Sequence, residues 1–125
     1  IYKGILDHRS TGVFVGDVHV YPDAQRITAH QVNKNILLSP SAKAYTQPKL
    51  QIYADDVICT HGAAIGQLDT EAIFYMKSRG ISEKAAKQLL INGYTSEIVQ
   101  TIENDALRQY LELAVVNALG EKINV

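Results

Sequence analysis

The pattern of apolar residues changes near residue 68, and this change constrains the fold more than any other feature of the sequence. Before it, short apolar runs are separated by Gly, Asp, Asn, Ser or Pro. In 13–15 and 18–20, valine recurs at every second position, which is typical of a β-strand. Short strands with brief connections predict either a hairpin sandwich or a coiled parallel β-solenoid for residues 1–68.

Two details favour the solenoid over the sandwich. The runs in residues 1–68 lack the Asn-Gly and Asp-Gly turns that mark β-hairpins. Asn33 and Asn35 flank a predicted bend between two runs, where stacked turns of a β-helix often use Asn. The predicted strands are 1–6, 12–20, 26–32, 35–38, 49–54, 56–61 and 63–68.

The rest of the chain reads as a small bundle of helices, predicted as a helical subdomain over residues 69–125. Asp69 is a favourable N-cap for the first helix, and Gly80 is placed to end it. Ser82 caps a second helix, which Gly93 is expected to stop. The predicted helical segments are 70–79, 82–92, 96–102 and 104–119.

Composition excludes several classes of function. Hydrophobic residues make up 46% of the chain, charged residues 20%, and the formal net charge is −1. There is no basic run that would bind nucleic acid or an anionic membrane, and no signal peptide or apolar run near the roughly 20 residues of a membrane span. The single cysteine cannot form an internal disulfide, which favours a reducing, cytoplasmic location.

Cys59 and His61 are the residues most suited to chemistry. They lie two apart in a predicted strand, so their side chains share a face with Cα atoms roughly 6–7 Å apart. Both could reach one metal, one cluster edge or one partner surface. Two ligands do not close a structural zinc site, which takes about four. We therefore expect no metal site within the chain alone, whereas a ligand set shared with another subunit stays open.

Other interpretations of the same pair remain. Cys59 can be a small buried hydrophobe, and His61, just before Gly62, can be a turn histidine. In a catalytic interpretation Cys59 is the nucleophile and His61 its base. The side chains of a strand pair at i and i+2 run parallel rather than toward each other, and no orienting acid is evident. The sequence also lacks the glycine-rich motifs of nucleotide-binding proteins.

Longer stretches of the sequence resemble a known family. The segments AHQVNKNILLSP, KLQIYADDVICTHGAAIGQLD and FYMKSRGI are the specific ones, and the likeness covers Gly12 to about Tyr94. They resemble the SufB/SufD family of iron–sulfur cluster assembly proteins, and within it the SufD branch. The resemblance implies a mainly β fold with α: a right-handed parallel β-helix, here its C-terminal turns in residues 1–68, followed by a helical subdomain.

The resemblance also implies a function. The expected role is that of a non-catalytic scaffold subunit of the SUF complex. Such a subunit pairs with a SufB-like paralogue and binds a SufC-like ABC ATPase. Cys59 and His61 match the family's CxHGA motif and are the expected ligands of a nascent iron–sulfur cluster at a subunit interface. Leu90, Ile91 and Tyr94 are the expected ATPase-docking face. No stably bound cofactor is expected, because a nascent cluster would form only in the full complex.

Two alternatives of other classes stay open at this point. One is a metal- or thiol-dependent enzyme that uses Cys59 and His61; the other is a purely structural β-solenoid interaction module. Because the chain begins with Ile1 inside a strand-like run, we expect a fragment that lacks the N-terminal part of such a protein. An open first turn could then associate artificially, which gives a homodimer through the β-helix as a further arrangement.

Overall fold

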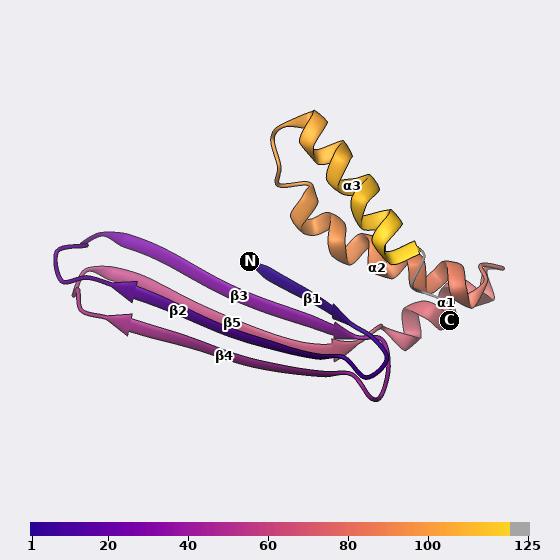
Figure 1. Ribbon diagram of the computed structural model, residues 1–125, viewed down its shortest axis with the longest axis horizontal. Helices are drawn as coiled ribbons and strands as arrows, with labels where there is room; N and C mark the ends of the chain where they lie inside the picture. The colour runs from indigo at the N-terminus through magenta and orange to yellow at the C-terminus, as the bar shows by residue number, and fades with distance from the viewer. Residues whose placement is uncertain (121–125) are drawn as a thin grey trace. The chain divides into compact units, whose positions relative to one another are not determined.

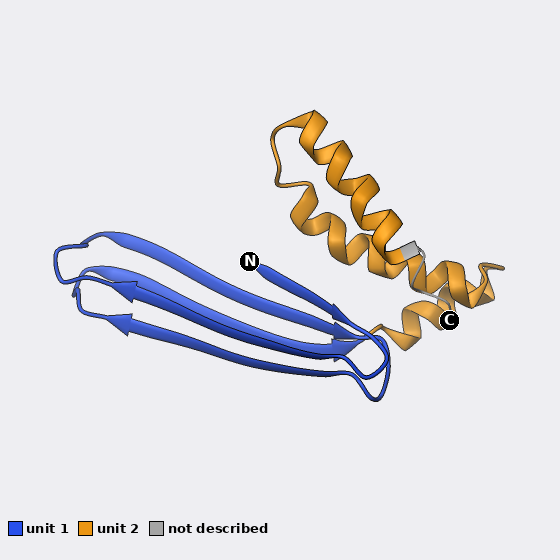
Figure 2. Cartoon of the chain, in the orientation of Figure 1, with its two compact units in different colours: residues 1–67 blue, residues 68–125 orange. Residues whose placement is uncertain are grey.

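The computed structural model describes residues 1–120, which form five strands followed by three helices (Figure 1). The chain divides into two compact units, residues 1–67 and 68–125 (Figure 2). The predicted order of a β part followed by helices is confirmed. The last five residues of the predicted helical subdomain, 121–125, lie outside the described residues.

The strands form two parallel sheets, and the chain alternates between them. One sheet has the order β1-β3-β5, and the other pairs β2 with β4. Every pairing is parallel, which excludes the hairpin sandwich because hairpins pair antiparallel. The strands are β1 (Tyr2–Leu6), β2 (Thr11–Val20), β3 (Ile27–Leu37), β4 (Lys43–Ile52) and β5 (Val57–Gln67).

Three predicted strand boundaries were wrong. The expected bend at Asn33 and Asn35 does not exist, because β3 continues through both residues and pairs with β5 along its whole length. The expected break at Gly62 is likewise bridged by β5. The predicted strand 49–54 starts earlier, at Lys43, since β4 pairs with β2 over residues whose side chains are mostly small or polar. In each case, hydrogen bonding to the neighbouring strand extended the strand through polar residues or glycine.

The two sheets face each other across a narrow interior. The rings of Tyr2 and Phe14, from opposite sheets, have centroids 4.8 Å apart. A Cβ atom on Gly16 would lie 2.8 Å from ring atoms of Phe14 and closer still to Nε2 of Gln31. Gly16 is buried, so the amide of Gln31 on β3 occupies the space that a side chain on β2 would need. The sheets approach closely here because position 16 has no side chain.

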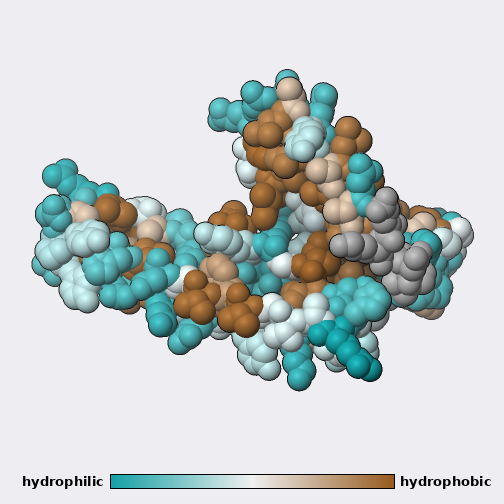
Figure 3. Space-filling model, in the orientation of Figure 1, coloured by the Kyte–Doolittle hydropathy of each residue, from teal (hydrophilic) through white to brown (hydrophobic). Residues whose placement is uncertain are grey.

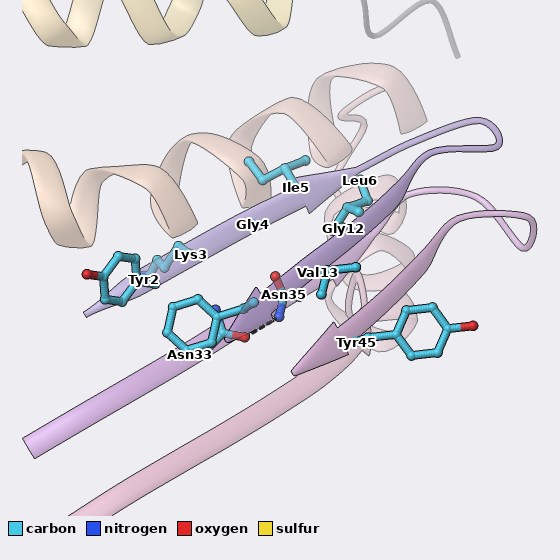
Figure 4. A pocket seen from close by; sticks show the side chains of 11 residues that line it. Tyr2, Lys3, Gly4, Ile5, Leu6, Gly12, Val13, Asn33, Asn35 and Tyr45 are labelled. Carbon is cyan, nitrogen blue, oxygen red and sulfur yellow. Dashed lines mark hydrogen bonds between the residues drawn. The ribbon is translucent and has the colours of Figure 1, made fainter. Parts of the chain in front are cut away.

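Part of this interior is polar. Asn33 is 3% exposed, and its Oδ1 accepts a hydrogen bond of 2.7 Å from Nδ2 of Asn35 (Figure 4). Both line a pocket of about 250 Å³ together with residues of β1 and β2. Two further buried side-chain oxygens, Oε1 of Gln31 and Oγ1 of Thr46, have no hydrogen-bond partner among the described residues. Asn33 and Asn35, which flank the predicted bend, are therefore strand residues that face the interior.

The helical unit contains α1 (Thr70–Ser78), α2 (Glu83–Val99) and α3 (Asp105–Gly120). The predicted N-caps are confirmed: Oδ1 of Asp69 accepts from the N–H of Glu71 at 2.9 Å, and Oγ of Ser82 accepts from the N–H of Ala85 at 3.2 Å. Gly80 follows α1 with a φ of +88°, as a residue that ends a helix often does. Within the described residues no helix is both long and apolar enough to span a membrane.

The prediction that Gly93 stops the second helix was wrong. α2 runs through Gly93, and residues 96–99 of the expected third helix, 96–102, form its last turn. The hydroxyls of Thr95 and Ser96 donate to the carbonyl of Asn92, at 3.0 and 2.7 Å, inside the helix instead of capping a new one. Buried Ile91 and Val99 anchor the helix on both sides of the glycine, so packing outweighs its low helix propensity.

Gly16→Ala tests the close approach of the sheets. The added methyl group must displace Gln31 or Phe14, so we expect the free energy of unfolding to fall by about 1–3 kcal/mol in urea denaturation. Gly62→Ala is the matched control, because a Cβ there meets no atom within 4 Å. Equal stability of the two variants would contradict the described interior.

Gly93→Ala tests the continuity of α2. In a continuous helix, alanine lowers the entropy lost on folding, and a Cβ at this position meets nothing within 4 Å. We expect the free energy of unfolding to rise by about 0.5–1 kcal/mol, measured by urea denaturation followed through the helical circular dichroism signal. A helix that ended at Gly93 with a left-handed residue would instead be destabilised by the same change.

Candidate functional site

The predicted pair Cys59 and His61 lies in the middle of β5. Cys59 is opposite Ala29 and His61 is opposite Gln31 in the parallel ladder with β3. Side chains of opposed residues point to the same face of a sheet. Since the amide of Gln31 lies against β2, this face is the one turned toward the second sheet. The pair therefore shares the inner face of the sheet.

The two side chains differ in accessibility. Cys59 is a free, half-buried thiol, whereas His61 is exposed. The alternative interpretation of His61 as a turn histidine is wrong, because the strand continues to Gln67. Among the described residues, no three His, Cys, Asp or Glu side chains are grouped so that they could hold a metal ion. Any metal or cluster bound by Cys59 and His61 would need further ligands from elsewhere.

His30 provides a contrast within the same sheet. It is one position before Gln31 and therefore lies on the opposite, outer face. Its Nδ1 lies 2.6 Å from Oγ1 of Thr60, its ladder partner on β5. His30 and His61 are thus two exposed histidines of one sheet with different surroundings.

The open edge of β4 is interrupted by a proline. The N–H groups of Lys43 and Tyr53 donate to the carbonyls of Ser10 and Val20, both at 2.9 Å. Residues of a parallel strand face its two edges alternately, so the odd-numbered residues of β4 face β2. Pro48 is in the even-numbered set, and its missing N–H falls on the edge that no strand covers among the described residues.

The open edge of β5 has no such interruption. The N–H of Leu38 donates to the carbonyl of Leu6 at 2.8 Å, so even-numbered residues of β3 face β1 and odd-numbered ones face β5. In a parallel pair only one of two opposed residues directs its backbone groups into the ladder. Cys59 and His61, opposite odd-numbered residues, therefore direct theirs to the free edge. β5 contains no proline and no Asp, Glu, Lys or Arg, which leaves an edge ready for another strand.

The predicted docking residues on α2 separate into core and surface. Ile91 is only 1% exposed and belongs to the core of the helical unit. Leu90 and Tyr94, one helical turn apart, are half-buried. Burial raises the pKa of the Tyr94 phenol above its ordinary value of 10.0, and the neighbouring charge of Glu97 raises it further. Leu90 and Tyr94 are therefore the accessible part of the predicted face.

Sequence reasoning missed a larger apolar surface on the same unit. Four apolar residues of α3 remain largely exposed although the helix packs on α2: Leu107, Tyr110, Leu113 and Val116. Hydrophobic atoms are visible over the helical unit in Figure 3. The spacing of three residues between them was the available signal. It was overlooked because Leu107 and Tyr110 were assigned to one apolar stripe with Leu111 and Val115, which are half-buried.

Comparisons with known proteins identify a family. Residues 1–94 match the family model described as SUF system FeS cluster assembly, SufBD core domain. The chain is 37% identical to the iron–sulfur cluster assembly protein SufD of Escherichia coli, with 98% of this chain covered. It is 41% identical to a SufBD family protein of Synechocystis and 40% identical to the chloroplastic protein ABCI7 of Arabidopsis thaliana, with 92% and 86% of this chain covered.

The matched region is a limited part of those proteins. The chain spans 28% of the E. coli protein, 25% of the Synechocystis protein and 23% of the Arabidopsis protein. The family match nevertheless covers most of this chain and includes both Cys59 and His61. The chain belongs to the SufBD family of SUF-system iron–sulfur cluster assembly proteins and is similar to its SufD members.

Proposed function

We propose that the chain is part of a scaffold subunit of the SUF complex in the cytoplasm, which has no catalytic activity of its own. The open edge of β5 would bind a SufB-like paralogue, and the helical unit would bind a SufC-like ABC ATPase. The observation that carries this proposal is the edge itself. It combines backbone groups that pair with no strand in the described part of the chain with the inward side chains of Cys59 and His61.

The β unit fits the last turns of a right-handed parallel β-helix. Its chain alternates between two parallel sheets, so each strand pairs with the second strand along the sequence. Right-handed connections are strongly preferred between parallel strands, which is the reason for proposing that hand. A solenoid that stops at β5 would leave this edge for a partner strand.

The donor set suits iron in a cluster that is assembled and then passed on. Thiolates hold most biological clusters, and imidazole replaces them in some. Cys59 and His61 would supply two ligands, and the partner across the interface would supply the others. Such a shared site exists only in the assembled complex. The cluster is therefore cargo rather than a resident cofactor of this chain.

The helical unit supports the proposed ATPase contact. Leu90 and Tyr94 form a partly accessible strip on α2, and α3 adds exposed apolar side chains. Isolated exposed apolar residues are ordinary, but several on one small helical unit are typical of a protein interface. Ile91 would support this surface from within the core rather than contact the ATPase.

His61→Ala tests the proposed cluster site in the full-length protein co-expressed with its SufB-like and SufC-like partners. We expect the complex to assemble with a cluster content, measured as iron and acid-labile sulfide, that falls at least about tenfold, because one ligand is lost. His30→Ala is the matched control, as His30 lies on the outer face of the same sheet. Normal cluster content in His61→Ala would favour a purely structural β-solenoid module.

Tyr94→Asp tests the ATPase contact. A charge on a partly desolvated apolar strip opposes burial by a partner, so we expect the ATPase to be lost from co-purification while the SufB-like subunit is retained. Tyr21→Asp, in an exposed turn of the β unit, is the control. Circular dichroism must show unchanged helix content. Retained ATPase binding under that condition excludes Tyr94 from the docking surface.

A further inference from the structure

Gln31 is the residue that faces His61 across the ladder of β3 and β5. Adjacent strands lie about 4.8 Å apart, and both side chains are on the inner face of the sheet. The amide of Gln31 extends into the narrow interior, since its Nε2 lies where a Cβ atom on Gly16 of β2 would be. Gln31 is therefore a polar group that points into the interior from the position opposite His61.

The carbonyl oxygen of this amide needs a donor. Oε1 of Gln31 is buried and has no hydrogen-bond partner among the described residues. A buried acceptor without a partner costs about 1–3 kcal/mol, so a hydrogen bond to Oε1 would be stabilising. A neutral imidazole carries one N–H, and His61 is the ladder partner of Gln31.

The same sheet shows that such a bond is within reach. His30 and Thr60 are the ladder partners one position earlier, on the outer face, and their side chains lie 2.6 Å apart. A histidine on one of these strands thus reaches the side chain opposite it on the other strand. His61 and Gln31 repeat that arrangement on the inner face with the roles of the strands exchanged.

We propose that Gln31 is a positioning residue for His61. Its Oε1 accepts the N–H of the imidazole, which selects one tautomer and leaves the other ring nitrogen unprotonated at the open edge of β5. Metal-binding histidines usually donate their second nitrogen to an acceptor in this way, which orients the ring and raises its basicity. Delivery of that nitrogen to iron rests on the function proposed above, whereas the hydrogen bond itself does not.

The first experiment reads the tautomer directly in the full-length protein without a cluster. Nitrogen-15 NMR of the imidazole at a pH where the ring is neutral distinguishes one fixed tautomer from a mixture, with His61→Gln used for assignment. We expect a single tautomer in the wild type and a mixture in Gln31→Leu. Gln47→Leu makes the same change at an exposed site on β4 and is expected to have no effect. A mixture in the wild type overturns the proposal without any variant.

The second experiment measures cluster content in the assembled complex. We expect Gln31→Leu to lower it about tenfold with assembly intact, the size typical of a lost supporting residue. Gln31→Glu keeps an acceptor of the same size and is expected to restore it. If the cluster content falls in His61→Ala but is normal in Gln31→Leu, Gln31 has no positioning role and the proposed function stands. If the cluster content of His61→Ala is itself normal, the proposed function fails. The NMR result alone then shows whether the hydrogen bond between Gln31 and His61 exists.

Discussion

The in-register parallel pairing of β3 with β5 is the constraint on which the rest of the structure depends. It sets which side chains of β5 turn inward and which backbone groups stay at the free edge. A shift of the pairing register by one residue would turn Cys59 and His61 to the outer face, where His30 now lies. The narrow interior resists such a shift, because Gly16 is the buried position that leaves space for Gln31.

The pairing also accounts for the mixed character of the interior. Side chains from the two facing sheets fill the interior, and the apolar residues Leu6 and Val20 are buried at the ends of their strands. The middle contains amides and a hydroxyl, and one hydrogen bond joins the amides of Asn33 and Asn35. Gln31 is not satisfied within the described residues. The interior is therefore apolar at its ends and polar in its middle, on the face of the sheet that also carries His61.

Local signals in the sequence predicted some elements well and others poorly. Asp69 and Ser82 predicted two helix starts, because a cap depends on a few neighbouring residues. Asn33, Gly62 and Gly93 led to wrong predictions of a bend, a strand break and a helix end. Whether an element continues through these residues depends on pairing or packing with residues far along the chain. Cys59 and His61 stood out by spacing and family resemblance. Gln31 did not, since only the register of β3 against β5 places it beside His61.

The proline on the outer edge of β4 has a consequence for how copies of such a chain can meet. Two sheets ending at the same turn would offer two templates, and units with two matching templates can add end to end into fibres. Pro48 removes a donor from one template, so a strand approaching β4 cannot complete its ladder there. Of these two edges, only that of β5 therefore offers an added strand a ladder without a missing donor.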